Sequence, residues 1–80
     1  MEQPTRDMIS YQLQQFLDGG TTRENVSEWA QAMIRNDDLI RITDIDAWHY
    51  LVAISNIDER IDPDTYLYDE KDIREIMAHY

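Results

Sequence analysis

The sequence predicts an all-α fold, a compact bundle of three to four helices with a long acidic loop before the last helix. Apolar residues recur at intervals of three and four over several segments, which is the spacing of one helix face. No segment alternates at period two for long enough to predict a sheet. The 80 residues form a single helical domain, 1–80, because two domains would leave roughly 40 residues each, too few to fold unaided.

The first half of the chain contains two helical patterns. Apolar residues from Met8 to Leu17 predict a helix over 5–17, and Gly19 permits the left-handed conformation that closes a helix. A second stripe predicts a helix over 23–35; its members are Val26, Trp29, Ala30, Met33 and Ile34. Thr21 and Thr22 can both cap this helix, and Thr21 with Glu24 is expected to form a capping box.

The second half contains two further helices and the acidic loop. The third helix begins near Thr43 or Asp44. No residue from Ala47 to Ile57 is formally charged, which predicts a central helix surrounded by the others. Residues 58–69 form the loop, with a turn at Pro63. Asp69 is expected to cap a fourth helix over 70–79. We also expect Trp29 and Trp48 to be important core residues.

Charge is the strongest global signal in the sequence. Seventeen acidic residues against seven basic ones give a net charge of −10. Residues 37–80 carry twelve of the acids and only four of the bases. This composition argues against direct binding of nucleic acid or of an anionic membrane, because both require clustered Lys and Arg. It favours a basic protein partner; the alternative is that the acidity only maintains solubility.

The sequence offers little for catalysis. The chain has no cysteine, its two histidines lack a partner set, and no phosphate-binding glycine loop is present. An EF-hand frame starting at Asp58 fails, since it would place Arg60 and Pro63 at its third and sixth positions. We therefore expect no enzyme, no cofactor and no metal. With no signal peptide and no long apolar segment, we expect a cytoplasmic protein.

The acidic loop is the candidate site for partner binding. Tyrosine supplies a large contact area for little lost entropy, and carboxylates around it could meet the Lys and Arg of a partner. The alternative is that the tyrosines only cover the edge of the core. The proposed partner-binding residues are Asp58, Glu59, Asp62, Asp64, Tyr66, Tyr68 and Asp69.

Several motifs resemble those of a family of small, uncharacterised, acidic bacterial proteins. They are FLDG at 16–19, TRENVSEWA at 22–30, the pair Asp44 and Trp48, and YLY at 66–68. A looser similarity in size, acidity and helical content links the chain to the immunity proteins of bacteriocins and contact-dependent toxins. This second resemblance implies binding to a basic toxin.

These observations lead to one expected function and two alternatives. We expect an immunity-like inhibitor of a basic toxin, such as a nuclease, which binds through its acidic half as a monomer or weak dimer. The first alternative is an antitoxin or nucleic-acid mimic whose carboxylates imitate phosphates. The second is a self-associating accessory protein.

Overall fold

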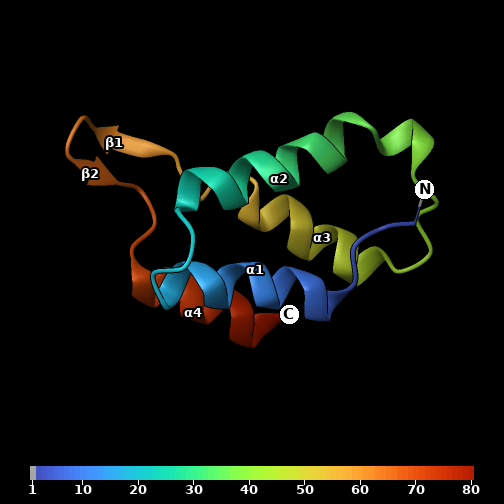
Figure 1. The fold of residues 1–80 in the computed structure, drawn as a ribbon, viewed down its shortest axis with the longest axis horizontal. Coiled ribbons are helices and arrows are strands. Elements are labelled where there is room, and N and C mark those ends of the chain that lie inside the picture. The colour runs from blue at the N-terminus through green and yellow to red at the C-terminus, as the bar shows by residue number, and fades with distance from the viewer. Residues whose placement is uncertain (1) are drawn as a thin grey trace.

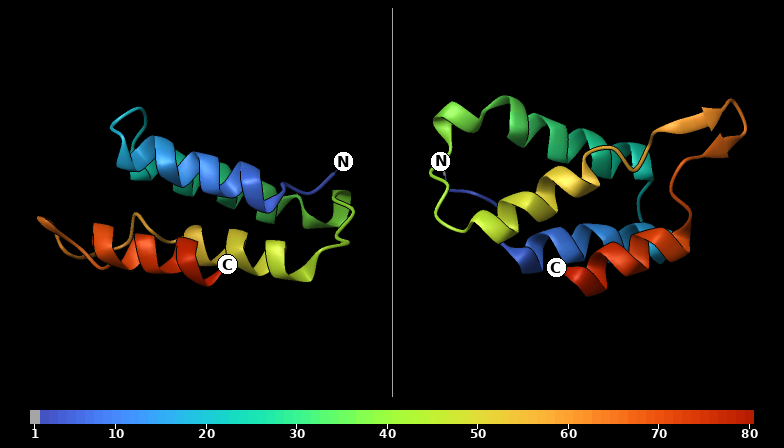
Figure 2. Two further views of the ribbon diagram at one scale, coloured as in Figure 1. Left: turned by 90° about the horizontal axis from the view of Figure 1, so that it is seen from below. Right: turned by 180° about the vertical axis from the view of Figure 1, so that it is seen from behind.

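The computed structural model describes residues 2–80, in which four α-helices form two layers (Figures 1 and 2). One layer holds α1 (Arg6–Leu17) and α2 (Arg23–Arg35), and the other holds α3 (Ile45–Ile54) and α4 (Glu70–His79). α1 and α3 each pack against the other three helices. A short 3₁₀ helix, η1 (Asp37–Leu39), follows α2.

Short polar side chains define where each α-helix begins. The hydroxyl of Thr5 accepts a hydrogen bond from the amide of Met8, at 3.1 Å, and Asp44 caps α3 in the same way. Asp69 and Asp72 form a reciprocal capping box at the start of α4. The α2 cap is Thr22, which accepts from the amide of Asn25, so the expected capping box from Thr21 to Glu24 is wrong.

The expected all-α class is also wrong, because the connection between α3 and α4 contains a small sheet. Strands β1 (Arg60–Asp62) and β2 (Thr65–Tyr66) pair antiparallel and project from one end of the helical body (Figure 1). These strands are too short to produce a recognisable alternation, and every residue of β1 is exposed. The fold is therefore mostly helical with a two-stranded hairpin in place of the expected long loop.

The turn of the hairpin is held by its own polar groups. The carboxylate of Asp62 accepts a hydrogen bond from the amide of Asp64, at 2.9 Å, which is the arrangement of an Asx turn. The guanidinium of Arg60 donates to the carbonyl oxygen of Pro63, at 3.0 Å. The hairpin thus depends on local hydrogen bonds, and not on the alternation of apolar and polar residues that is typical of a strand.

The core lies between the two helical layers. Its fully buried residues come from all four α-helices and from the segment after α3; they are Ile9, Leu13, Val26, Ala30, Tyr50, Leu51, Ile54, Ile57 and Ile73. Trp29 and Trp48 are only partly buried and pack against this cluster. α3 is central as expected, but it is not covered on every side, because Ile45 and Val52 are exposed.

Candidate functional site

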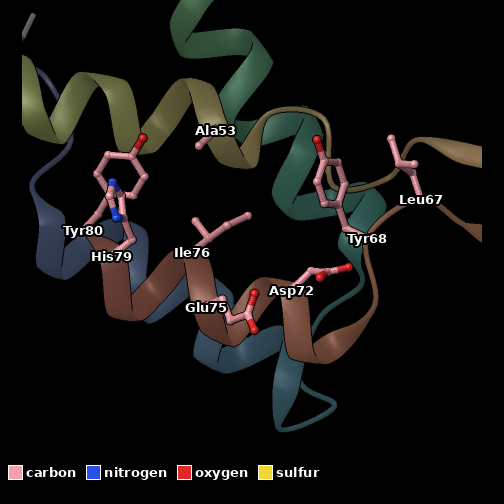
Figure 3. Close-up of a pocket in the computed structure, with 8 residues that line it drawn as sticks. All are labelled: Ala53, Leu67, Tyr68, Asp72, Glu75, Ile76, His79 and Tyr80. Atoms are coloured by element: carbon pink, nitrogen blue, oxygen red, sulfur yellow. The ribbon is translucent and has the colours of Figure 1, made fainter.

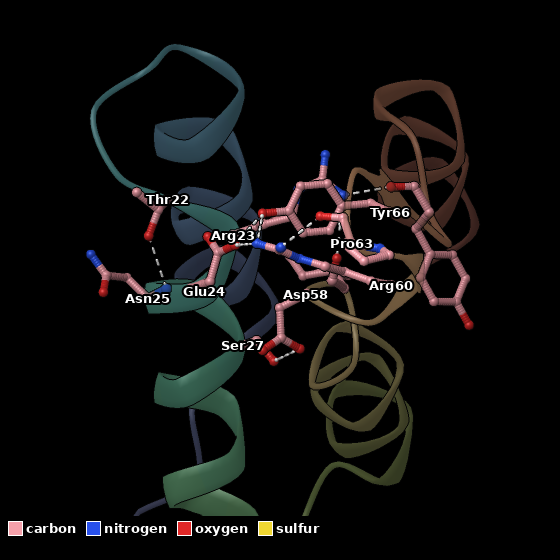
Figure 4. Close-up of polar contacts among 11 residues, drawn as sticks. Thr22, Arg23, Glu24, Asn25, Ser27, Asp58, Arg60, Pro63 and Tyr66 are labelled. Carbon is pink, nitrogen blue, oxygen red and sulfur yellow. Dashed lines mark hydrogen bonds and ion pairs between the residues drawn. The ribbon is translucent and has the colours of Figure 1, made fainter.

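The hairpin is attached to the helical body through the first turn of α2 (Figure 4). The ring of Tyr66, from β2, lies close to two guanidinium groups: Cζ of Arg23 is 3.9 Å from the ring centroid and Cζ of Arg60 is 4.8 Å from it. The phenol of Tyr66 donates a hydrogen bond to the carboxylate of Glu24. Arg60 also forms an ion pair with Glu24, at 3.5 Å.

Arg23 makes the most contacts in this cluster. Its guanidinium donates hydrogen bonds to the carbonyl oxygens of Ile57, at 3.3 Å, and of Tyr68, and it also lies over the ring of Phe16. One side chain of α2 therefore fixes both the entry to the hairpin and the exit from it. Arginine suits this position because its planar guanidinium can stack on an aromatic ring and donate several hydrogen bonds at the same time.

The contacts of Tyr66 change the acid–base properties of its neighbours. The hydrogen bond from Tyr66 is the main reason that the pKa of Glu24 lies below its usual value, with a further contribution from Arg60. The same phenol is the main reason that the pKa of Arg60 is raised. The cluster thus holds Glu24 and Arg60 in their charged forms.

A second polar cluster joins the middle of α2 to the start of the 58–69 segment. The buried hydroxyl of Ser27 is within hydrogen-bond distance of the carboxylate of Asp58, at 2.8 Å, and of the carbonyl oxygen of Ser55. Gln31 donates to that carbonyl oxygen, at 2.8 Å. Asp58 is therefore occupied by an intramolecular contact at the base of the hairpin.

The structure places the seven residues that the sequence predicts as a partner-binding patch on the hairpin and the segments that flank it. Asp58, Asp62 and Asp69 each accept hydrogen bonds within the chain, and Tyr66 is held by the α2 cluster. Glu59 and Asp64 are exposed, whereas Tyr68 is half-buried. Sequence reasoning missed Arg23, which organises this region, because no local pattern connects it to residues more than thirty positions away.

The cationic side chains fall into two groups. Arg6 is paired with Asp46 at 3.4 Å, and Arg23 and Arg60 belong to the hairpin cluster. The remaining four are exposed and form no ion pair among residues 2–80; they are Arg35, Arg41, Lys71 and Arg74. Arg35 ends α2, whereas Lys71 lies in the first turn of α4; Figure 1 places these two helix ends at opposite ends of the molecule.

Lys71 and Arg74 are three residues apart on α4 and therefore share one face of the helix. Asp72 and Glu75, each one position further on, lie about 100° around the helix axis from Lys71 and Arg74 respectively. We call Lys71 and Arg74 the cationic stripe of α4; Glu75 and Glu70 flank it, because they are four residues from Lys71 and Arg74 respectively. The three-residue spacing of the two basic residues was visible in the sequence, but the total charge of the chain obscured it.

Within residues 2–80, the α-helices are joined by 18–22, by 36–44 and by the hairpin segment 55–69. The described residues also contain no group of His, Asp and Glu side chains that could hold a metal ion, and none of their helices could cross a membrane.

Comparison with known proteins gives a match along almost the whole chain. Residues 4–80 match the protein family described as YxzC DNA-binding protein. The curated Uncharacterized protein YxzC of Bacillus subtilis (strain 168) is 34% identical over 68 residues, which is 85% of this chain. The chain spans about half the length of that relative, since the match covers 55% of it. No solved structure matches the chain.

These matches overturn the functional expectations drawn from charge. The family description conflicts with an immunity-like inhibitor, with the two alternative functions and with the exclusion of nucleic acid. The physical error was to apply the charge of the whole molecule to every face of it, although a ligand experiences mainly the groups within about a Debye length, roughly 8 Å at physiological salt. The motif resemblance to small acidic bacterial proteins and the absence of enzymatic activity stay predictions.

Proposed function

Because the chain belongs to the YxzC family, we propose that it is a DNA-binding protein, as the description of that family states. The single observation that supports this role is the match over residues 4–80, which includes every helix and both strands. The proposal includes a cytoplasmic location, where DNA is accessible in a bacterium.

We propose that DNA contacts the cationic stripe of α4. Lys71 and Arg74 are exposed, carry no ion pair among the described residues and point in one direction from a single helix. They also lie in the N-terminal half of α4, where the helix dipole favours an anion. Arg35 is less suited, because it lies in the last turn of α2, where the dipole disfavours a phosphate.

The acidity of the chain limits the mode of binding. A net charge of −10 repels the phosphate backbone, and Glu70 and Glu75 flank the cationic stripe, so DNA can contact the protein only locally, through Lys71 and Arg74. Two phosphate contacts release few counterions, and the logarithm of the affinity should fall with the logarithm of salt concentration with a slope of about −2. This slope is shallow compared with that of strongly basic DNA-binding proteins.

Fluorescence anisotropy with a labelled DNA duplex tests the proposal. We expect saturable binding with a dissociation constant between about 1 and 100 µM if the site reads no sequence, and tighter binding to duplexes selected from a random pool. The paired variant Lys71→Gln with Arg74→Gln should weaken binding and remove most of the salt dependence. No binding of any duplex by the wild-type protein would reject the proposed function.

A matched pair of substitutions tests the assigned face. Arg35→Gln with Arg41→Gln removes the same charge from the other exposed arginines, and we expect it to leave affinity within about twofold. If this control loses as much affinity as the α4 variant, DNA does not contact the α4 stripe specifically. Circular dichroism of both variants checks that each retains its helices.

A further inference from the structure

A groove lies between α3, the segment that follows β2, and α4 (Figure 3). Its volume is about 610 Å³, which is in the range of small-molecule sites. The groove does not coincide with the cationic stripe of α4, because neither Lys71 nor Arg74 lines it. It therefore requires an explanation separate from DNA binding.

The walls of the groove suit the apolar part of a ligand. Tyr68 stands at one end and Tyr80 at the other, with Ile76 between them (Figure 3). The ring of Tyr80 is itself supported, since it stacks on the buried Tyr50 with centroids 5.2 Å apart. An aromatic ring held in this way can receive a ligand without losing rotamer freedom, which favours binding.

The polar lining of the groove is acidic. Asp72 and Glu75 lie along the α4 side of the groove (Figure 3), and neither forms an ion pair among residues 2–80. Asp72 uses its carboxylate in the capping box of α4, whereas Glu75 is exposed. His79 also lines the groove, and it meets the ring of Tyr80 edge-on.

We propose that this groove binds a small organic cation that consists of an ammonium group on an apolar chain. The carboxylates attract the charge, the two tyrosine rings accept a cation on their faces, and Ile76 contacts the hydrocarbon part. A neutral ligand would leave the carboxylates uncompensated, and an anion would be repelled by them. The expected ligand class is therefore a primary alkylamine.

Three probes of the same length separate charge from hydrophobicity: hexylammonium, hexan-1-ol and hexanoate. Each is titrated into the full chain under the same buffer conditions. Nitrogen–proton NMR spectra report the site of binding. We expect saturable shifts at the amides of Ile76, His79 and Tyr80 with hexylammonium, about three- to tenfold weaker binding of hexan-1-ol, and none of hexanoate.

Two charge-matched variants assign the cation to the groove. Glu75→Gln should weaken hexylammonium binding about two- to fivefold, whereas Glu70→Gln, on a different face of α4, should not change it. Equal affinity for hexan-1-ol and hexylammonium, shifts confined to another surface, or equal effects of the two variants would overturn the inference. DNA binding is unaffected by any of these outcomes, because it is assigned to Lys71 and Arg74.

Discussion

The guanidinium of Arg23 lies on the ring of Tyr66, with its Cζ atom 3.9 Å from the ring centroid. The two residues belong to the first turn of α2 and to β2, which are adjacent only in the folded chain. The same guanidinium donates to carbonyl oxygens on both sides of the hairpin. This one side chain therefore sets the position of the hairpin on the helical body.

Replacement of Arg23 should loosen the hairpin and lower stability. We expect Arg23→Ala to reduce the free energy of unfolding by about 1–3 kcal/mol, because it removes stacking on Tyr66 and leaves two carbonyl oxygens without their donor. Urea denaturation followed by tryptophan fluorescence measures this change. Arg41→Ala removes an exposed arginine and should alter stability by less than about 0.5 kcal/mol. Equal effects of the two substitutions would contradict the role of Arg23.

Glu24 should make the stability of the protein depend on pH in the acid range. Its pKa is lowered in the folded state, chiefly by the hydrogen bond from Tyr66, relative to the usual value of 4.5. Its contribution to stability is therefore complete above pH 4.5 and is lost as the pH falls through the lowered value. Urea denaturation from neutral to acid pH should show a smaller loss of stability in Glu24→Gln than in the wild-type protein.

Glu28→Gln is the control for this measurement. It removes one carboxylate from the same helix without touching Tyr66, and so separates the loss of a contact from the loss of a charge. If Glu24→Gln and the wild-type protein lose stability in parallel over the whole acid range, the contact between Glu24 and Tyr66 has no energetic role.

Tyr50 should make the stability of the protein depend on pH in the alkaline range. Burial raises its pKa above 10.0, although the hydrogen bond with Ser10, at 3.0 Å, partly opposes the shift. The stability contributed by the neutral phenol is complete below pH 10 and declines as the pH rises through the raised value. Ultraviolet difference spectra should show one tyrosine that ionises late, and this late step should be absent from Tyr50→Phe.

Tyr50→Phe also tests the hydrogen bond with Ser10. The substitution should cost about 0.5–1.5 kcal/mol near neutral pH, because Ser10 loses its partner while the ring remains packed. Tyr11→Phe removes an exposed hydroxyl and is the matched control. A late-ionising tyrosine that survives in Tyr50→Phe would show that another phenol is responsible.

Ile73 should be the residue that holds α4 on the core. Its side chain is fully buried, and Ile73→Ala is expected to cost about 2–5 kcal/mol of stability by leaving a cavity. Ile61, on the hairpin, is 66% exposed, so Ile61→Ala should cost less than about 0.5 kcal/mol. Thermal unfolding of both variants makes the comparison, and a similar midpoint for the two would contradict the assignment of the core.

The sequence predicted the helices well where an amphipathic stripe and a cap agree. The expected ranges 23–35 and 70–79 coincide with α2 and α4, and Asp69 caps α4 as expected. The hairpin was missed because its strands are very short and depend on side-chain contacts of Arg60 and Asp62. Such contacts carry no periodic signal.

The functional site was less predictable for a different reason. Tyr66 was identified as a notable residue, but its partner Arg23 precedes it by more than forty positions, and only the tertiary fold brings them together. The exclusion of nucleic acid failed because total charge does not describe single faces. Lys71 and Arg74 illustrate this, since they lie in the most acidic part of the sequence.

The hairpin turn projects away from the helices, and this has a practical consequence for protein engineering. Pro63 and Asp64 are exposed, and the side-chain contacts that hold the turn are made within the hairpin itself. An inserted peptide tag or a fluorophore at this tip should therefore be tolerated without repacking the core.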